Sequence, residues 1–146
     1  MSESTSEARR LRTLPTRLLS LAATYADRRV NEALGGVGAR KWHYAVLATL
    51  DEFGSASQAE LSDRTRIYRS DLVAVINELT ERRFVERSPD PADRRRNVVS
   101  MTAAGRHHLG QLDRLLTEVQ DDVLAPLTSQ DREQLTRLLA ALVREH

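Results

Sequence analysis

The sequence predicts a mostly α-helical fold that carries a small two-stranded β wing. Two observations indicate it. Near both ends of the 146-residue chain, apolar residues recur every three or four positions, which is the spacing of one helix face. Between these ends, residues 57–101 read as a short helix, a longer helix, and two short strands around an arginine-rich loop. This order predicts a winged helix-turn-helix with terminal dimerisation helices.

Composition limits the possible functions. The formal net charge is only +1, so any affinity for nucleic acid has to come from local clusters of arginine. The chain has no cysteine, which excludes disulfides, thiolate catalysis and cysteine-based metal sites. Its sequence contains no apolar run of membrane-spanning length and no signal peptide at the N-terminus. We therefore expect a cytoplasmic protein with no membrane partner.

Residues 1–40 are expected to form an N-terminal dimerisation helix, preceded by a frayed polar segment, residues 1–7. Its apolar seam consists of Leu11, Leu14, Leu18, Leu21 and Tyr25. Pro15 falls inside the seam, so the helix either begins near Thr13 with the proline in its first turn or is kinked there. The pair Gly35-Gly36 predicts its end.

Residues 41–101 are expected to form the winged helix-turn-helix. A helix over residues 40–53 is stopped by Gly54. Ser57 then caps a short helix, with Glu60 at the capping-box position. The next helix begins near Tyr68, and its core stripe is Leu72, Val75, Ile76 and Leu79. Strands starting at residue 84 and spanning residues 97–101 flank a loop over residues 88–96, which holds two prolines.

Residues 102–146 are expected to form two C-terminal dimerisation helices. Residues 1–40, 41–101 and 102–146 are expected to belong to one integrated domain. Thr102 caps the first helix, Pro126 breaks it, and Ser129 caps the second. Their seams are Leu109, Leu112, Leu116, Val119 and Val123, then Leu135, Leu138, Leu139, Leu142 and Val143. A monomeric helical core would use the same residues. A homodimer is favoured, because two-fold pairing matches DNA half-sites about one helical turn apart.

Residues 88–105, SPDPADRRRNVVSMTAAG, resemble the wing signature of the MarR family of transcription regulators, which reads Asp-Pro-x-Asp-x-Arg, a strand, and Leu-Thr-x-x-Gly. Met101 stands where leucine is usual. The helix RSDLVAVINELTERRFVER is also similar, except that Arg83 stands where the family has glycine. The resemblance covers nearly the whole chain. It implies a homodimer with interleaved terminal helices, a palindromic operator, and in many members relief of repression by a small molecule.

The start of the second helix of the helix-turn-helix is expected to contact DNA, because such helices enter the major groove by their first turn. Candidates there are Tyr68, Arg69, Ser70, Asp71, Val73 and Ala74. Asp71 either accepts from a cytosine amine or, as we favour, holds a neighbouring arginine. Gln58, Arg64 and Arg66 flank the turn and could contact phosphates. The alternative for each is a solvated helix surface.

The wing loop carries Arg94, Arg95 and Arg96, which are predicted to enter the minor groove. Asp93 beside them is expected to pair with an arginine and fix the loop. The alternative is a solvated run of charge. Bound to DNA, the protein would be associated with the nucleoid.

A small aromatic effector is a further possible partner. Trp42, His43 and Tyr44 form an aromatic cluster, and Arg17 on the first helix could meet a ligand carboxylate. In the family, effectors bind between the dimer helices and the winged lobe. Packing of Trp42 and Tyr44 in the core is the alternative.

No cofactor, metal site or catalytic activity is predicted. His43, His107, His108 and His146 lack metal-ligand spacing, and no nucleophile elbow or glycine-rich phosphate loop occurs. The sequence leaves three possibilities open: a ligand-responsive dimeric repressor, a ligand-independent regulator, and a helical protein-interaction module.

Overall fold

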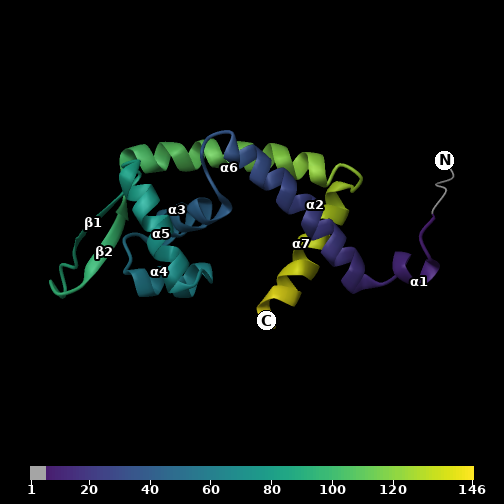
Figure 1. Cartoon of the computed structure of the whole chain (residues 1–146), viewed down its shortest axis with the longest axis horizontal. Helices are drawn as coiled ribbons and strands as arrows, with labels where there is room; N and C mark the ends of the chain where they lie inside the picture. The colour runs from purple at the N-terminus through teal and green to yellow at the C-terminus, as the bar shows by residue number, and fades with distance from the viewer. Residues whose placement is uncertain (1–5) are drawn as a thin grey trace. The chain divides into compact units, whose positions relative to one another are not determined.

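The structure is a computed structural model and describes residues 6–146 (Figure 1). Most of the segment expected to be frayed therefore lies outside the described residues. The described chain consists of α1 (Arg9–Arg12), α2 (Pro15–Gly35), α3 (Lys41–Phe53), α4 (Gln58–Thr65), α5 (Arg69–Glu81), β1 (Val85–Pro89), β2 (Asn97–Met101), α6 (Ala103–Val123) and α7 (Ser129–Arg144). This confirms a mostly helical fold with a two-stranded wing. None of the described helices has the length and apolar character needed to cross a membrane.

The described residues divide into two compact units. Residues 31–117 form a winged unit, and residues 6–30 together with 118–146 form a terminal unit. The winged unit holds the larger core, built almost wholly from leucine, valine and isoleucine because the chain has few aromatic residues. Its fully buried side chains are Leu34, Val46, Leu47, Leu61, Leu72, Val75, Ile76, Leu79, Val85 and Leu112. All four residues of the predicted α5 stripe are among them.

Local capping signals set most helix boundaries as predicted. The Ser57 hydroxyl accepts from the Glu60 backbone N–H at 3.2 Å, and the Glu60 carboxylate accepts from the Ser57 N–H at 3.4 Å. Thr102 caps α6 by accepting from the Gly105 N–H at 3.0 Å. Gly54, at φ +81°, ends α3. Pro15 is the first residue of α2, where its missing N–H costs no hydrogen bond, so the first of the two alternatives for this helix is correct.

Two predicted boundaries are wrong. The wing loop spans residues 90–96, since Ser88 and Pro89 belong to β1 and pair with Val98 and Asn97. Proline is tolerated there because it ends a strand at the edge of the sheet. Thr128 and not Ser129 caps α7, with its hydroxyl accepting from the Asp131 N–H at 3.1 Å. Adjacent hydroxyl residues are hard to separate by sequence, and backbone geometry decides between them.

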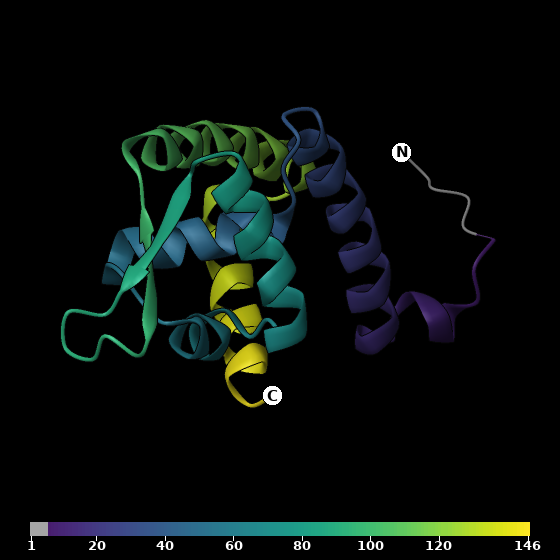
Figure 2. The same cartoon turned by 60° about the vertical axis from the view of Figure 1, so that its left-hand side comes forward.

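The wing is an antiparallel hairpin whose register runs from the Val85–Met101 pair to the Pro89–Asn97 pair (Figure 2). Ala56, just before α4, adds a third pairing: its N–H donates to the Val99 carbonyl at 3.1 Å, and the Val99 N–H donates to the Ala56 carbonyl at 2.8 Å. Val85, Val99 and Ala56 are buried. These contacts anchor the wing to the helix-turn-helix.

The end of α5 places Arg83 in a backbone conformation that favours glycine. Arg83 has φ +63°, in the left-handed region that favours glycine. Its N–H donates to the Thr80 carbonyl at 3.0 Å, and the Phe84 N–H donates to the Leu79 carbonyl at 2.9 Å. These two bonds form a Schellman motif, whose left-handed position is usually glycine. The chain keeps this helix end in spite of its arginine.

The terminal unit leaves its apolar seams exposed. Arg29 of α2 pairs with Asp122 of α6 at 2.9 Å, and Arg132 of α7 pairs with Asp121 at 3.1 Å. No residue of α7 is buried. The exposed apolar side chains are Leu11, Leu14, Leu18, Leu19, Leu21, Tyr25, Leu138, Leu139, Leu142 and Val143. In a single chain, the predicted seams of α1, α2 and α7 therefore contact water, whereas Leu109, Leu112 and Val119 of the α6 seam are buried.

Candidate nucleic-acid interface

The first two turns of α5 present most of their predicted contact residues to solvent. The turn before them is fixed by Arg66, which has φ +61°, and by the Ser62 hydroxyl, which donates to the Ile67 carbonyl at 2.6 Å. Ile67 is buried, whereas Tyr68 at the helix N-cap is 80% exposed. Arg69, Ser70, Val73 and Ala74 are also exposed. This end of α5 also carries the positive end of the helix dipole.

Asp71 differs from its expected role. It lies in the first turn of α5 and is half-buried. Among residues 6–146 it forms no ion pair, so it does not hold a neighbouring arginine in this structure. Its carboxylate is stabilised where it lies by the dipole of α5. Contact with a base edge remains a prediction for this residue.

A hollow of about 410 Å³ joins three elements of the winged unit. It is lined by Ser57, Gln58, Ala59, Arg69, Arg96 and Asn97, from the start of α4, the start of α5 and the junction of the wing loop with β2. Two guanidinium groups therefore border one concavity, together with the N-terminus of α4. Such a combination suits a phosphate, because backbone N–H groups and the dipole favour an anion and arginine forks bind its oxygens.

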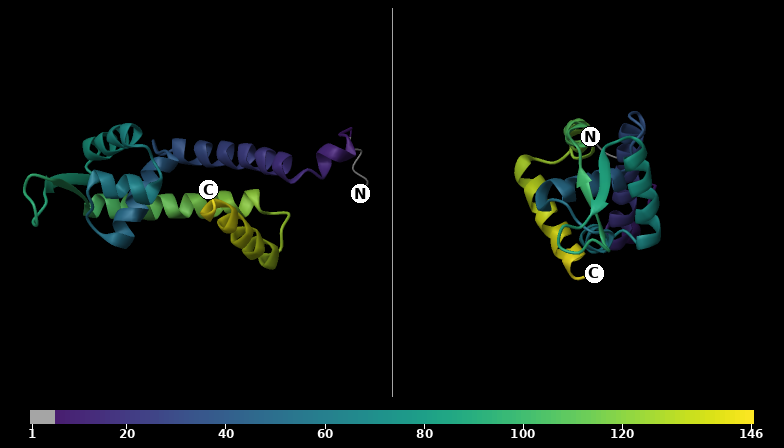
Figure 3. Two further views of the ribbon diagram at one scale, coloured as in Figure 1. Left: turned by 90° about the horizontal axis from the view of Figure 1, so that it is seen from below. Right: turned by 90° about the vertical axis from the view of Figure 1, so that its left-hand side faces the viewer.

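The wing loop is held by its own acidic residue. The Asp93 carboxylate accepts from the backbone N–H of Arg95 at 3.1 Å and from its Nε at 3.3 Å. This confirms that Asp93 pairs with an arginine. Arg96 lies 3.9 Å from the Glu60 carboxylate, and the exposed Arg94 has no ion-pair partner in the part of the chain that the structure describes. Figure 3 shows the loop extending beyond α3, α4 and α5, where it can reach a neighbouring molecule.

One contact that positions the wing was not predicted. The Arg87 guanidinium on β1 donates to the Asn77 side-chain oxygen on α5 at 2.7 Å. It ties the wing strand directly to the predicted recognition helix. The alternation of side chains along a strand places Arg87 on the same face as buried Val85, and this was the signal available in the sequence.

The predicted effector residues lie in different surroundings. Arg17 belongs to the terminal unit and pairs with Glu7. Trp42 lines a hollow at the start of α3, whereas Tyr44 lines a second hollow on the same helix. The Tyr44 hydroxyl donates to the Asp113 carboxylate at 2.6 Å, and this bond raises the pKa of Tyr44 to about 12.

His43, the fourth of these residues, is buried and lines neither hollow. Its Nδ1 accepts from the Arg40 backbone N–H at 2.9 Å, so its Nε2 carries the proton and faces the Glu78 carboxylate at 3.2 Å. Burial lowers the pKa of His43 below its ordinary value, and this outweighs the opposing effect of Glu78. The residue therefore serves as a neutral link between α3 and α5.

Residues 36–96, which include α3, the helix-turn-helix and most of the wing, match the model of the MarR family. An HTH-type transcriptional regulator of Mycobacterium tuberculosis is 31% identical over 104 residues, covering 69% of this chain and 73% of that protein. A transcriptional repressor of Pseudomonas putida, NicR, is 27% identical over 100 residues, or 68% of this chain. The chain spans about three fifths of the length of that repressor, 63%.

Solved structures share the fold over nearly the whole chain. A probable transcriptional regulator from Pseudomonas aeruginosa has a TM-score of 0.81 and 32% identity, covering 91% of this chain and 99% of its own. BpsR of Bordetella bronchiseptica, whose DNA binding is regulated by 6-hydroxynicotinic acid, has a TM-score of 0.82 at 21% identity, covering 95% of this chain and 98% of its own. At that identity the likeness of BpsR establishes the fold alone.

Proposed function

Because the chain belongs to the MarR family of transcriptional regulators, we propose that it is a homodimeric repressor that leaves a palindromic operator when a small phenolic or aromatic acid binds. The observation that carries the proposal is the convergence of Gln58, Arg69 and Arg96 on one hollow beside the exposed start of α5. Proteins named as relatives are transcriptional regulators, a non-enzymatic role.

The exposed seams of the terminal unit support a dimer. Ten large apolar side chains on α1, α2 and α7 and the segment joining α1 to α2 contact water in the single chain, among them Leu18 at 46% and Leu142 at 49% exposure. Exposed apolar faces of this kind mark interaction surfaces. A second copy offers the same helices with the same spacing, so an isologous contact covers both sets at once. Each dimer then carries two winged units for the two halves of a palindrome.

The geometry of the winged unit supports a division of roles at the operator. In the proposed complex, α5 enters the major groove, and Arg69 and Tyr68 reach base edges or the adjoining phosphates. Gln58 and Arg96 hold a backbone phosphate at the hollow, which orients the module without reading sequence. Arg94 and Arg95 on the wing loop reach the minor groove. The Arg87–Asn77 bond keeps α5 and the wing in register for simultaneous contact.

Arg94→Ala tests the DNA-binding role. Arg94 is exposed and makes no ion pair within residues 6–146, so its removal should spare the fold. We expect operator affinity to fall more than tenfold, and the slope of log affinity against log salt to decrease by about one. Fluorescence anisotropy with a labelled duplex from upstream of the protein's own gene measures both quantities. Arg114→Ala, an exposed arginine on α6, is the charge-matched control.

Three results would contradict the proposal. Equal affinities for the Arg94→Ala and Arg114→Ala variants at physiological salt would remove the wing from the interface. Sedimentation of the protein as a monomer at micromolar concentration would contradict the proposed dimer. If the protein binds no fragment from upstream of its gene, or binds DNA without a steep salt dependence, the helical protein-interaction module is favoured instead.

A further inference from the structure

The short helix α1 concentrates positive charge in the terminal unit. Its sequence is RRLR, and it contains no acidic side chain. Arg9, Arg10 and Arg12 are all exposed, and none of them forms an ion pair within residues 6–146. The whole chain has a net charge of only +1, so α1 and the wing loop are its densest clusters of arginine. The DNA contacts proposed for the winged unit use only the second of these clusters.

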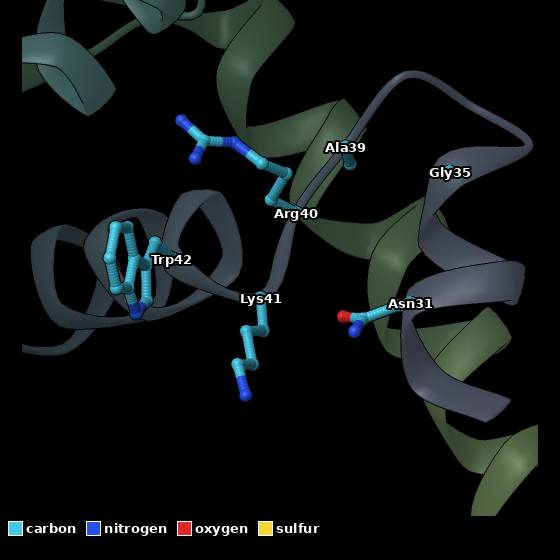
Figure 4. Close-up of a pocket in the computed structure, with 6 residues that line it drawn as sticks. All are labelled: Asn31, Gly35, Ala39, Arg40, Lys41 and Trp42. Carbon is cyan, nitrogen blue, oxygen red and sulfur yellow. The ribbon is translucent and has the colours of Figure 1, made fainter. Parts of the chain in front are cut away.

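Several exposed arginines outside the proposed DNA interface have a protein acceptor. The Arg40 guanidinium (Figure 4) donates to the Glu78 carboxylate, and the Arg106 guanidinium donates to the Asp51 carboxylate at 2.8 Å. Each of these bonds joins two helices of the winged unit, so these arginines have a structural role. The three arginines of α1 have no such acceptor in the described part of the chain. A structural role within one chain therefore does not account for them.

The acidic residue nearest to α1 in the described sequence is already paired. Glu7 is the only residue with a carboxylate side chain in residues 6–26. It accepts from the guanidinium of Arg17 on α2, whose Nε lies at 3.2 Å. This pair leaves α1 without a counter-charge from this part of the sequence. Because the pair joins residues on either side of α1, it also restrains the helix, and a restrained group loses less entropy when it binds a partner.

The geometry of α1 separates its arginines from its apolar side. Successive residues of a helix are rotated by about 100°, so Leu11 lies opposite the middle of the arc that the three arginines span. Leu11 is exposed and begins the apolar seam that continues through Leu14 and Leu18. The Thr13 hydroxyl donates to the Arg9 carbonyl at 3.0 Å and so closes the helical turn. In the proposed dimer a second copy covers the seam, and the arginines on the other side of α1 stay in contact with solvent.

We propose that the three arginines of α1 form a second DNA-contact surface, which binds backbone phosphates in addition to those that the winged unit contacts. The inference rests on the proposed function and adds a surface on the terminal unit. Duplex DNA carries one negative charge for about every 1.7 Å of its axis, so guanidinium groups on one helical turn match neighbouring phosphates. These arginines give up no protein ion pair when they bind. Because phosphates are the same in every sequence, the surface raises affinity and adds no sequence specificity.

A triple variant with Arg9→Gln, Arg10→Gln and Arg12→Gln tests the surface. Glutamine removes the three charges and forms helix about as well as arginine. Fluorescence anisotropy measures binding to a duplex from upstream of the protein's own gene and to an unrelated duplex of equal length. We expect both affinities to fall by the same factor, at least about tenfold at physiological salt. The slope of log affinity against log salt should decrease by about three for each subunit whose α1 contacts DNA.

Three further variants serve as controls. The charge-matched control carries Arg28→Gln, Arg114→Gln and Arg137→Gln, which are exposed positions outside α1, and it should lose less than about threefold in affinity because distant charges are screened. Lysine at the three α1 positions keeps the charge and should retain affinity within about threefold, since lysine also binds phosphate. Arg69→Ala should weaken binding to the upstream duplex more than binding to the unrelated one, because a contact with a base edge adds specificity.

Several results would overturn the inference. Equal DNA affinities of the α1 glutamine variant and the charge-matched control would assign the loss to total charge. An equal loss in the lysine variant would show that charge on α1 is not what binds. A loss confined to the upstream duplex would mean that α1 reads bases. If the glutamine variant binds DNA normally but sediments as a monomer at concentrations where the wild type is a dimer, the arginines contact the second copy and not DNA.

The same measurements separate this inference from the proposed function. If the wild-type protein binds neither duplex, the proposed function is wrong, and the inference that rests on it falls with it. If the wild type binds the upstream duplex and Arg94→Ala weakens this binding, while the α1 glutamine variant matches its charge-matched control, only the α1 surface is wrong.

Discussion

Replacing Arg83 with glycine should stabilise the protein. Arg83 has φ +63° at the left-handed position of the Schellman motif that ends α5. A residue with a Cβ pays about 1–2 kcal/mol for that conformation, which glycine avoids. Glycine also gives the unfolded chain more freedom, which costs about 0.4–1 kcal/mol. The difference predicts a gain of about 0.5–1 kcal/mol in the free energy of unfolding. The Thr102 hydroxyl bonds the backbone carbonyl of residue 83 at 2.7 Å, and glycine keeps this bond.

Urea unfolding at one fixed protein concentration measures this gain, because the stability of a dimer depends on concentration. In a thermal scan the same gain corresponds to an increase in Tm of about 1–4 °C for a chain of this size. Arg83→Ala is the control, since it removes the same side chain but keeps the Cβ. We expect its stability to stay within about 0.5 kcal/mol of the wild type. If alanine stabilises as much as glycine, the side-chain charge and not the backbone conformation is responsible. A destabilising glycine would refute the reasoning.

Two further predictions concern stability. Gly105→Ala should destabilise the protein by at least about 2 kcal/mol, because the added Cβ would lie 2.1 Å from the Phe84 backbone oxygen. In the same helix, the Cβ of Gly110→Ala would meet nothing within 4 Å, so this variant should be about 0.5–1 kcal/mol more stable than the wild type. Urea unfolding of both variants measures the two effects. Acidification should also destabilise. Burial lowers the pKa of His43 and of His108, so the unfolded chain binds more protons, and stability present above pH 6.5 is lost as the pH falls through the folded pKa values. Urea unfolding at pH 7.5, 6.5 and 5.5 measures this loss of stability, and the His108→Phe variant should show a weaker dependence of stability on pH. A gain in stability at pH 5.5 would contradict the prediction.

The sequence was sufficient where the causes of structure are local. The capping box of Ser57 and Glu60, the Thr102 cap and the stop at Gly54 each depend on residues within one turn of helix, so their spacing predicts them. The buried stripe of α5 follows from its period for the same reason. Where two neighbouring residues offer the same local chemistry, as Thr128 and Ser129 do, the sequence did not distinguish them.

The candidate sites needed more than local pattern. Gln58, Arg69 and Arg96 were each expected to contact DNA, but only the packing of α4, α5 and the wing brings them to one hollow. The aromatic cluster shows the opposite outcome. Trp42, His43 and Tyr44 are consecutive, yet rotation of about 100° per residue along α3 sends them into a hollow, the core and a contact with Asp113. Adjacency in sequence on a helix does not produce one site.

The sequence by itself determined the helices, the wing and the exposed arginines that we propose contact DNA, because helix periodicity and capping act over a few residues. Tertiary structure decided which of these groups meet. The Arg87–Asn77 bond, the pairing of Ala56 with Val99, and the link from Arg40 to Glu78 join residues 10, 43 and 38 positions apart. Contacts over such separations depend on how finished elements dock, and docking is set by the shape of the whole buried core.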